Sequence, residues 1–151
     1  MISFRKARHS DLASIIRLLA DDPLGQLREI VSDPVDPRYE KAFTAIVADG
    51  NQLLAVAVDE KDEVVGCLQL SFIPGLSRTG MWRGQIESVR VAAGQRGTGL
   101  GSQFIEWAIQ EAAERGCKLM QLTSDKARPD AIRFYEKLGF TVSHEGLKRN
   151  L

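Results

Sequence analysis

The strongest constraint on the fold is a glycine-rich segment between a strand pattern and a helix pattern, at residues 89–102. It reads Val-Arg-Val-Ala-Ala-Gly-Gln-Arg-Gly-Thr-Gly-Leu-Gly-Ser. Gly97, Gly99 and Gly101 lack Cβ atoms, so backbone amides there can approach a ligand closely, and the first amides of the helix that follows have no partner within it. Free amides at the positive end of a helix dipole bind anions. The segment predicts a site for a diphosphate group, with Arg96 as an additional charged donor.

Two common phosphate-binding motifs do not fit this segment. A Walker loop requires Lys and then Ser or Thr after its last glycine, but Gly99 is followed by Leu100. The dinucleotide fingerprint requires glycines at its first, third and sixth places, and the sixth place counted from Gly97 is Ser102. The structural alternative is a plain turn between strand and helix, although three alternating glycines cost backbone entropy without helping the fold.

Hydrophobic periodicity divides the rest of the chain into helices and strands. Prolines suited to a first helical position and glycines that follow an apolar face mark the helix ends. The pattern predicts four helices and a short irregular one: 12–19, 37–50, 101–115 and 129–139, with the short one within 26–31. It predicts about seven strands: 4–7, 53–58, 64–73, 85–91, 118–123, 140–143 and 147–150.

The composition bounds the function classes. The 151 residues are enough for one domain, residues 1–151, and 44% of them are hydrophobic. The 20 basic and 20 acidic side chains cancel, which argues against disorder and against broad electrostatic capture of nucleic acid. No apolar run suits a membrane helix or a signal peptide, so we expect a cytoplasmic protein without a membrane partner. The isolated cysteines and histidines, Cys67, Cys117, His9 and His144, predict neither a disulfide nor a metal site.

Two motifs together resemble the GNAT superfamily of N-acetyltransferases. Residues 96–101, Arg-Gly-Thr-Gly-Leu-Gly, match its Arg/Gln-x-x-Gly-x-Gly/Ala acetyl-CoA loop, and residues 133–140, Arg-Phe-Tyr-Glu-Lys-Leu-Gly-Phe, are similar to its C-terminal signature. The element order from residue 4 to residue 151 also resembles the whole GNAT domain. The resemblance implies an α/β fold with a mixed, mostly antiparallel sheet of about seven strands, splayed at its central pair and flanked by about four helices.

The resemblance also implies how the acetyl donor is held. In the family, the loop amides grip the diphosphate of acetyl-CoA and the pantetheine arm inserts beside the strand that precedes the loop. The coenzyme-binding residues implied here are Val89, Val91, Arg96, Gly97, Thr98, Gly99, Leu100, Gly101 and Ser102. The Val91 amide is then the expected donor to the oxyanion. The asparagine that often follows the next strand in the family is absent, and Ser124 and Asp130 occupy that region.

Two residues are the expected catalytic groups. Tyr135 matches the family tyrosine whose hydroxyl points at the thioester sulfur. A phenol of pKa about 10 is a weaker acid than a thiol of about 8.5, so full proton transfer is uphill by roughly 2 kcal/mol and a hydrogen bond is the lesser alternative. Glu87 is the expected base, acting through a water, and strand alternation would place it on the face of Val89 and partly desolvate it. Ordered water alone, or an orienting role for Glu87, are the alternatives.

Two segments are expected to contact the acceptor, residues 21–37 and 74–84. The first carries acidic side chains that would suit a cationic amine, although such residues commonly serve solubility alone: Asp21, Asp22, Asp33 and Asp36. Apolar residues in and near the second could form a wall: Phe72, Met81 and Trp82.

The sequence therefore predicts a transferase, an N-acetyltransferase that moves the acetyl group of acetyl-CoA to the primary amine of a small molecule. Transfer would be direct, through a tetrahedral intermediate and without a metal. Two alternatives stay open: acetylation of protein lysines or N-termini, and a non-catalytic acetyl-CoA-binding module in regulation. Homodimers are common among members of the resembled family, and the residues leave that question open.

Overall fold

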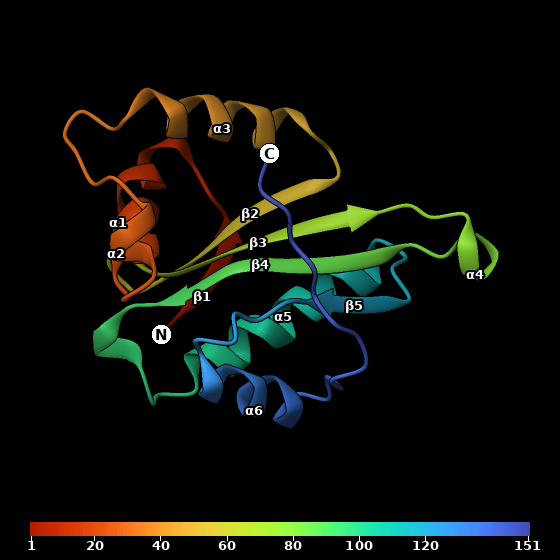
Figure 1. Cartoon of the computed structure of the whole chain (residues 1–151). Helices are drawn as coiled ribbons and strands as arrows, with labels where there is room; N and C mark the ends of the chain where they lie inside the picture. Colours follow the sequence, from red (N-terminus) through yellow and green to blue (C-terminus); the bar gives the residue numbers. More distant parts are fainter.

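A computed structural model describes residues 1–151 as a twisted sheet with helices on both faces (Figure 1). The sheet has five strands in sequence order: β1 Ser3–Lys6, β2 Gln52–Val58, β3 Val64–Ile73, β4 Arg83–Val91 and β5 Leu119–Leu122. The first four strands pair antiparallel, and β5 pairs parallel with β4. The mixed, mostly antiparallel α/β architecture expected from the sequence is confirmed.

The four predicted main helices are present, with ends within two residues of the expected ones. They are α1 Leu12–Ala20, α3 Pro37–Ala48, α5 Leu100–Glu114 and α6 Pro129–Lys137. Short turns complete the set: η1 His9–Asp11, α2 Gly25–Arg28, α4 Ser77–Gly80 and η2 Ala93–Gln95. In Figure 1, α1, α2 and α3 lie on one face of the sheet, and α5 and α6 lie on the other.

The prediction of two C-terminal strands is wrong. Residues 140–143 and 147–150 belong to no strand, and residues 141–151 make no backbone hydrogen bond. Their local strand propensity is real, but a strand needs a neighbour that supplies ladder hydrogen bonds, and this chain provides none for them. The sheet therefore has five strands instead of seven.

Each face of the sheet buries its own apolar cluster. On the α5 face, Phe104 and Ile105 are fully buried against Leu68 and Leu70 of β3. On the α1 and α3 face, Ile15, Ile16 and Phe43 share a cluster with Val56 and Cys67. Because strand residues alternate between faces, this division tells on which side each site residue lies.

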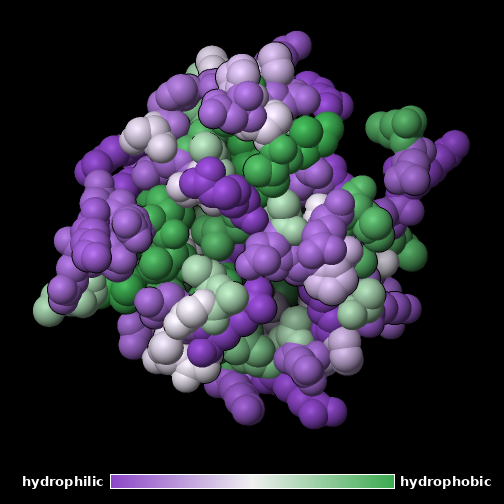
Figure 2. Space-filling model, turned by 90° about the vertical axis from the view of Figure 1, so that its left-hand side faces the viewer, coloured by the Kyte–Doolittle hydropathy of each residue, from purple (hydrophilic) through white to green (hydrophobic).

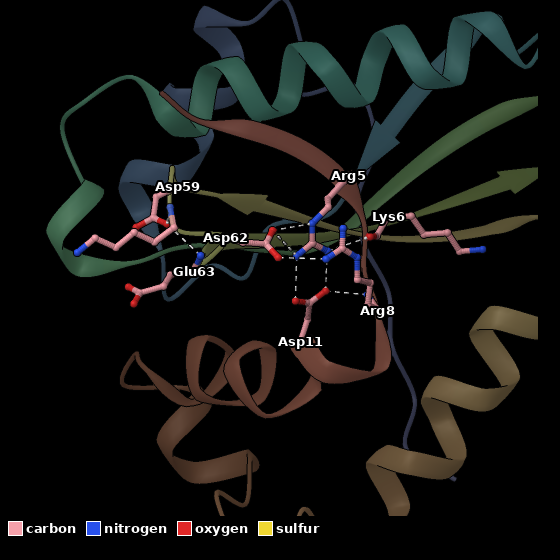
Figure 3. A network of polar contacts seen from close by, with 8 residues as sticks. Arg5, Lys6, Arg8, Asp11, Asp59, Asp62 and Glu63 are labelled. Carbon is pink, nitrogen blue, oxygen red and sulfur yellow. Dashed lines mark hydrogen bonds and ion pairs between the residues drawn. The ribbon is translucent and has the colours of Figure 1, made fainter.

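A partly buried ion-pair network fixes the start of α1 (Figure 3). The Arg5 guanidinium donates to both carboxylate oxygens of Asp11, at 2.7 and 3.1 Å, and the Arg8 amide donates to the same carboxylate at 2.7 Å. Arg5 and Arg8 also donate to Asp62, in the turn between β2 and β3. Burial alone would raise the pKa of Asp11, but these donors outweigh it and the pKa lies below its ordinary value. The network therefore holds β1, α1 and the β2–β3 turn together.

No helix in the structure combines the length and apolar character needed to cross a bilayer. The cytoplasmic location stays a prediction.

Candidate active site

The glycine loop presents a row of unpartnered backbone amides at the start of α5. Five amides there donate no hydrogen bond: those of Gly97, Gly99, Leu100, Gly101 and Ser102. The first backbone hydrogen bond of the helix comes from the next residue, where the Gln103 amide donates to the Gly99 carbonyl at 3.1 Å. Because α5 runs for 15 residues, these amides also lie at the positive end of a full helix dipole. The arrangement suits a diphosphate.

Glycine is required in this loop for two different reasons. Gly97 and Gly99 have φ of +78° and +85°, the left-handed region that side chains rarely adopt. Gly101 is required for packing instead, since a Cβ there would lie 3.3 Å from Cζ of Phe134 in α6. The loop is therefore shaped by backbone conformation and by the close approach of α6.

A gap opens in the sheet directly before this loop. The β4–β5 ladder runs only from Arg83 to Ile86, so the remainder of β4, residues 87–91, has no strand on its β5 side. The Ala92 amide donates to the carbonyl of Val65 in β3, so by alternation the Val91 amide points the other way, into the gap. The Val89 carbonyl accepts from the Arg90 side chain at 2.9 Å. The gap is the splay expected from the family resemblance.

A β-bulge in β4 corrects the expected position of Glu87. The register with β3 slips between Glu87 and Arg90, and Ser88 has a φ of +57°. Val89 then packs on the α5 face, whereas Glu87 pairs with Gln69, which lines a cavity beside α1 and α3. The prediction that Glu87 and Val89 share a face is wrong, because the extra residue inverts the alternation. Glu87 is also exposed instead of desolvated.

Tyr135 has a packed ring and a free hydroxyl. Its ring makes edge contacts with Phe134 and Phe140, at centroid distances of 5.1 and 5.8 Å. The hydroxyl has no hydrogen-bond partner in the chain and is not sealed from solvent. Burial raises the pKa of Tyr135, and the positive charges of Arg90 and Arg128 offset that rise only in part. The phenol is therefore a neutral donor at physiological pH.

Three charged residues from distant parts of the chain meet beside Tyr135, and sequence reasoning missed their contact. One Asp22 carboxylate oxygen lies 2.8 Å from Arg128 Nη2 and 3.0 Å from Arg90 Nε, although the Arg90 N–H is not aligned for a hydrogen bond. Burial and the neighbouring Arg128 charge lower the pKa of Arg90. The cluster joins β4 to the loops that follow α1 and β5. No local sequence pattern links residues so far apart.

Polar side chains line the sheet face next to the gap, on the side of α1 and α3. Gln121 donates to Gln85 at 2.7 Å, and Gln85 donates to Glu87 at 2.7 Å. A second set joins β2 to β3, where Gln52 accepts from the side chains of Gln69 and Ser71 at 2.9 Å. A core-facing sheet surface would be apolar, so this row suits contact with a polar ligand.

Hollows on the surface lie around this region. A mostly apolar cavity of about 170 Å³ between α1, α3 and the sheet reaches Gln69 and Ser88 at its polar end. A larger hollow of about 850 Å³ runs along α1 beside the β2–β3 turn and contains none of the predicted catalytic or coenzyme-binding residues. Figure 2 views the end where α1, α2 and the glycine loop meet, and apolar side chains there are recessed among polar ones.

The predicted apolar wall is not assembled. Phe72 is 3% exposed in the α5-side core, under the Arg115 guanidinium at 4.1 Å, so it cannot contact an acceptor. Met81 and Trp82 precede β4, at the opposite end of that strand from the glycine loop (Figure 1). Phe72 is therefore a core residue packed under α5, and its apolar character does not indicate a binding surface.

The acidic side chains of the segment after α1 are largely engaged. Asp22 is held by two arginines, and the Asp21 carboxylate lies 3.9 Å from Arg96. Asp36 caps α3 by accepting from the Arg38 amide, and the Arg38 side chain lowers the pKa of Asp36 to about 2. Asp33 is exposed and has no ion-pair partner, so only one of the four predicted acidic side chains is free of an arginine. Arg96 itself donates weakly to the Asp21 carbonyl at 3.4 Å, beside the glycine loop.

Comparison with known sequences identifies a matching family and relatives of this chain. The family described as "Acetyltransferase (GNAT) family" matches residues 13–140. An aminoalkylphosphonate N-acetyltransferase of Salmonella typhimurium is 32% identical over 77% of this chain and 75% of its own length. An L-methionine sulfoximine/L-methionine sulfone acetyltransferase of Pseudomonas paraeruginosa is 31% identical over 93% and 81%.

Solved structures superpose over the full chain. One described as a transcriptional regulator from Bacillus halodurans has a TM-score of 0.97 and 49% identity, covering 100% of both chains. A predicted acetyltransferase from Clostridium acetobutylicum, described as a structure with acetyl-CoA, has a TM-score of 0.75 and 23% identity, covering 99% of this chain and 96% of its own. At that identity the second match shows the fold alone.

Proposed function

The chain belongs to the GNAT family of acetyltransferases and is an acyltransferase, and from that premise we propose that it transfers the acetyl group of acetyl-CoA to the primary amine of a small molecule. The single observation that carries this proposal is the juxtaposition of the five free loop amides with the gap beside residues 87–91. The first suits the diphosphate of the coenzyme, and the second leaves room for its extended arm.

The coenzyme supplies an activated thioester when it is bound. The loop amides from Gly97 to Ser102 would hold its diphosphate, and Arg96 would add a charged donor beside them. The Val91 amide, which points into the gap, would donate to the carbonyl oxygen where negative charge develops. A fixed amide acts strongly there because it needs no reorganisation during the reaction.

Glu87 is proposed to receive the proton of the attacking amine through a water. An alkylammonium with a pKa near 10 must lose a proton, which costs about 4 kcal/mol at neutral pH. Glu87 lies at the edge of the gap, on the face where Gln85 and Gln69 also point. Its exposure gives a water access to it, and its bond from Gln85 fixes the direction of the carboxylate.

Tyr135 is proposed to stabilise the departing thiolate by donating a hydrogen bond. Its raised pKa makes full proton transfer less favourable still, so we assign it the role of donor and not that of acid. The free hydroxyl and the ring contacts with Phe134 and Phe140 support this role, since packing fixes the ring while leaving the oxygen available.

We propose further that the acceptor carries an acidic group near its amine. Arg90 and Arg128 lie close enough to Tyr135 to influence its pKa, and Asp22 now occupies the space between the two guanidiniums. Guanidinium pairs bind carboxylate, phosphonate and similar groups well. The named substrates of the two relatives, an aminoalkylphosphonate and L-methionine sulfoximine, combine an amine with such a group.

A panel of amines with acetyl-CoA, read by released thiol, tests the proposed function. Small aminophosphonates and amino acids should be acetylated, neutral amines of equal length less well, and lysine peptides least. Arg128→Ala should raise KM for the acidic amines about 10- to 100-fold, leaving the neutral ones unchanged, because only the acidic group loses a partner. The exposed Lys137→Ala in α6, the helix that begins directly after Arg128, is the matched control. Turnover of peptides in preference to every small amine would contradict the proposal.

One observation favours a second candidate, a regulatory module. The Bacillus halodurans relative is described as a transcriptional regulator. Binding of acetyl-CoA by calorimetry, with no thiol released on any amine or peptide, would support that candidate and exclude the catalytic proposal.

A further inference from the structure

The apolar cavity between α1, α3 and the sheet ends beside the residues proposed to act on the acceptor. Gln69 of β3 lines its polar end and pairs directly with Glu87 of β4. Cys67 also lines the cavity and pairs with Arg90, on the other side of the β-bulge. Directly paired residues of antiparallel strands point to the same face of the sheet. Glu87 and Arg90 therefore both lie on the face that carries the cavity.

The bulge residue Ser88 lies between these two pairs and forms part of the cavity wall. Its φ is +57°, and its carbonyl accepts a hydrogen bond from the Cys67 thiol at 3.6 Å. The β3 residues that pair with Glu87 and Arg90 are two positions apart, which is about 7 Å along the strand. One small molecule at Ser88 can therefore reach both side chains and the cavity.

The cavity is an incomplete part of the core on this side of the sheet. Ten of its twelve lining residues are apolar, most of them from α1 and α3, which lie on the same face (Figure 1). Leu54 in the middle of β2 is only partly buried, whereas Val56, on the same face, is fully buried. Protein interiors are normally filled, and a hollow forfeits the contacts that a filling group would make. An apolar hollow with a polar end suits the apolar part of a ligand.

The volume of the cavity limits what can enter. It measures about 170 Å³. A group the size of a water molecule takes up about 30 Å³, so the cavity holds roughly five methylene-sized groups. The carbon that carries the amine stays outside, beside Ser88, because Glu87 and Arg90 lie at that end.

We propose that the acceptor is an α-amino acid, or its phosphonate counterpart, whose apolar side chain of roughly four or five carbons fills this cavity. The inference rests on the proposed function, which places the amine beside Glu87 and the acid group at Arg90 and Arg128. The cavity adds a third attachment point to the same carbon atom. Three attachment points distinguish the two mirror-image forms of that carbon, so the site selects one enantiomer.

A series of unbranched α-amino acids tests the proposal, from 2-aminobutyrate through norleucine to 2-aminodecanoate. Calorimetry in the presence of coenzyme A measures their binding without turnover, and released thiol measures kcat/KM with acetyl-CoA. Each methylene that enters the cavity should improve both about fourfold. The gain should end after roughly five side-chain carbons, so 2-aminodecanoate should bind worse than norleucine. The matched 1-aminoalkylphosphonates should show the same length dependence, because their acid group lies outside the cavity.

Two substitutions on one face of α3 change the size of the cavity in opposite directions. Ala42 and Ile46 line it one helical turn apart, with Ala42 at the exposed rim. Ala42→Phe should weaken norleucine binding about 10- to 20-fold, the value of two methylenes, and leave 2-aminobutyrate unchanged. Ile46→Ala should lengthen the preferred side chain by about two carbons. Ala45→Phe, exposed on the same helix and outside the cavity, is the matched control, and thermal unfolding shows that each variant is folded.

The outcomes separate this inference from the proposed function. Binding and kcat/KM that do not change with chain length would overturn the inference even if every acid is acetylated. An equal gain for both enantiomers of norleucine would also overturn it. Binding that follows chain length and responds to Ala42→Phe, with no thiol released, would support the cavity assignment and contradict the proposed reaction. If none of these acids bound, both would be wrong.

Discussion

Valine in place of Gly99 should abolish tight coenzyme binding without unfolding the protein. Gly99 has a φ of +85°, and no atom lies within 4 Å of a Cβ built there, so the substitution brings conformational strain and no clash. A side chain in the left-handed region costs about 1–2 kcal/mol, and more when it is branched at Cβ. The backbone relieves this strain by rotating, which turns the amides of Gly99 and Leu100 away from the diphosphate.

The magnitude follows from the amides lost. Hydrogen bonds to charged groups contribute about 1.5–3 kcal/mol each, so two of them amount to about 3–6 kcal/mol, or roughly 10²- to 10⁴-fold in the dissociation constant. Isothermal titration calorimetry with acetyl-CoA measures this loss directly. Thermal unfolding of the same sample confirms that the protein remains folded.

Gly116→Val is the matched control. Gly116 ends the same helix with a φ of +89°, and no atom lies within 4 Å of its Cβ position, so the strain is equal but the glycine loop is untouched. Gly116→Val should lose similar stability and bind acetyl-CoA normally. If Gly99→Val bound within threefold of the unaltered protein, or if both variants lost affinity equally, the assignment of the loop amides would be refuted.

Three further outcomes are expected. Tyr135→Phe should lower kcat about 10- to 100-fold with unchanged acetyl-CoA affinity, because one hydrogen bond to a developing thiolate is lost; an unchanged rate when chemistry limits would remove Tyr135 from the mechanism. Glu87→Gln should lower kcat/KM about 10²-fold or more at neutral pH, and the rate should recover as the pH approaches the pKa of the amine. The control Glu106→Gln, at an exposed position, should leave kcat/KM unchanged. An effect of Glu87→Gln that does not depend on pH would argue for an orienting role. Asp11→Ala should cost about 2–3 kcal/mol in urea unfolding, since it removes the more buried carboxylate partner of Arg5, which is 19% exposed and keeps only Asp62 as a carboxylate partner. Because the folded-state pKa of Asp11 is lowered, its contribution is complete above the ordinary value of 3.8 and declines as pH falls below it, and the variant should lack that part of the acid dependence.

The sequence predicted the elements whose signals are local. Each main helix has its own apolar face and its own end signals, so α1, α3, α5 and α6 could be placed within two residues. The glycine loop was readable for the same reason, since Gly97 and Gly99 are conformational requirements of a few consecutive residues.

Two features that depend on contacts between distant parts of the chain were not predicted: the bulge in β4 and the cluster of Asp22, Arg90 and Arg128. The bulge at Ser88 is visible in the sequence only as an irregular spacing of apolar residues. The core-facing residues Ile86 and Val89 are three positions apart, whereas core-facing residues of a regular strand are two apart. The cluster of Asp22, Arg90 and Arg128 is not visible in the sequence, because its members meet only when three loops and strands converge.

In the C-terminal segment, by contrast, the sequence predicted strands that the structure lacks. Residues 140–150 have the composition of strands, but whether they pair depends on an edge that is not next to them in sequence. Phe72 was misassigned because an apolar residue near the end of a strand suits a core and a binding wall equally well until its face is known.

An amide ¹H–¹⁵N titration of the protein with acetyl-CoA tests most directly whether the loop amides bind the diphosphate of the coenzyme. The amides of Gly97, Gly99, Leu100, Gly101 and Ser102 should shift downfield together as their protons bond to the diphosphate, with Val91 responding at the gap. If those six amides stayed at their original positions while the coenzyme bound elsewhere, the account of this site would be wrong.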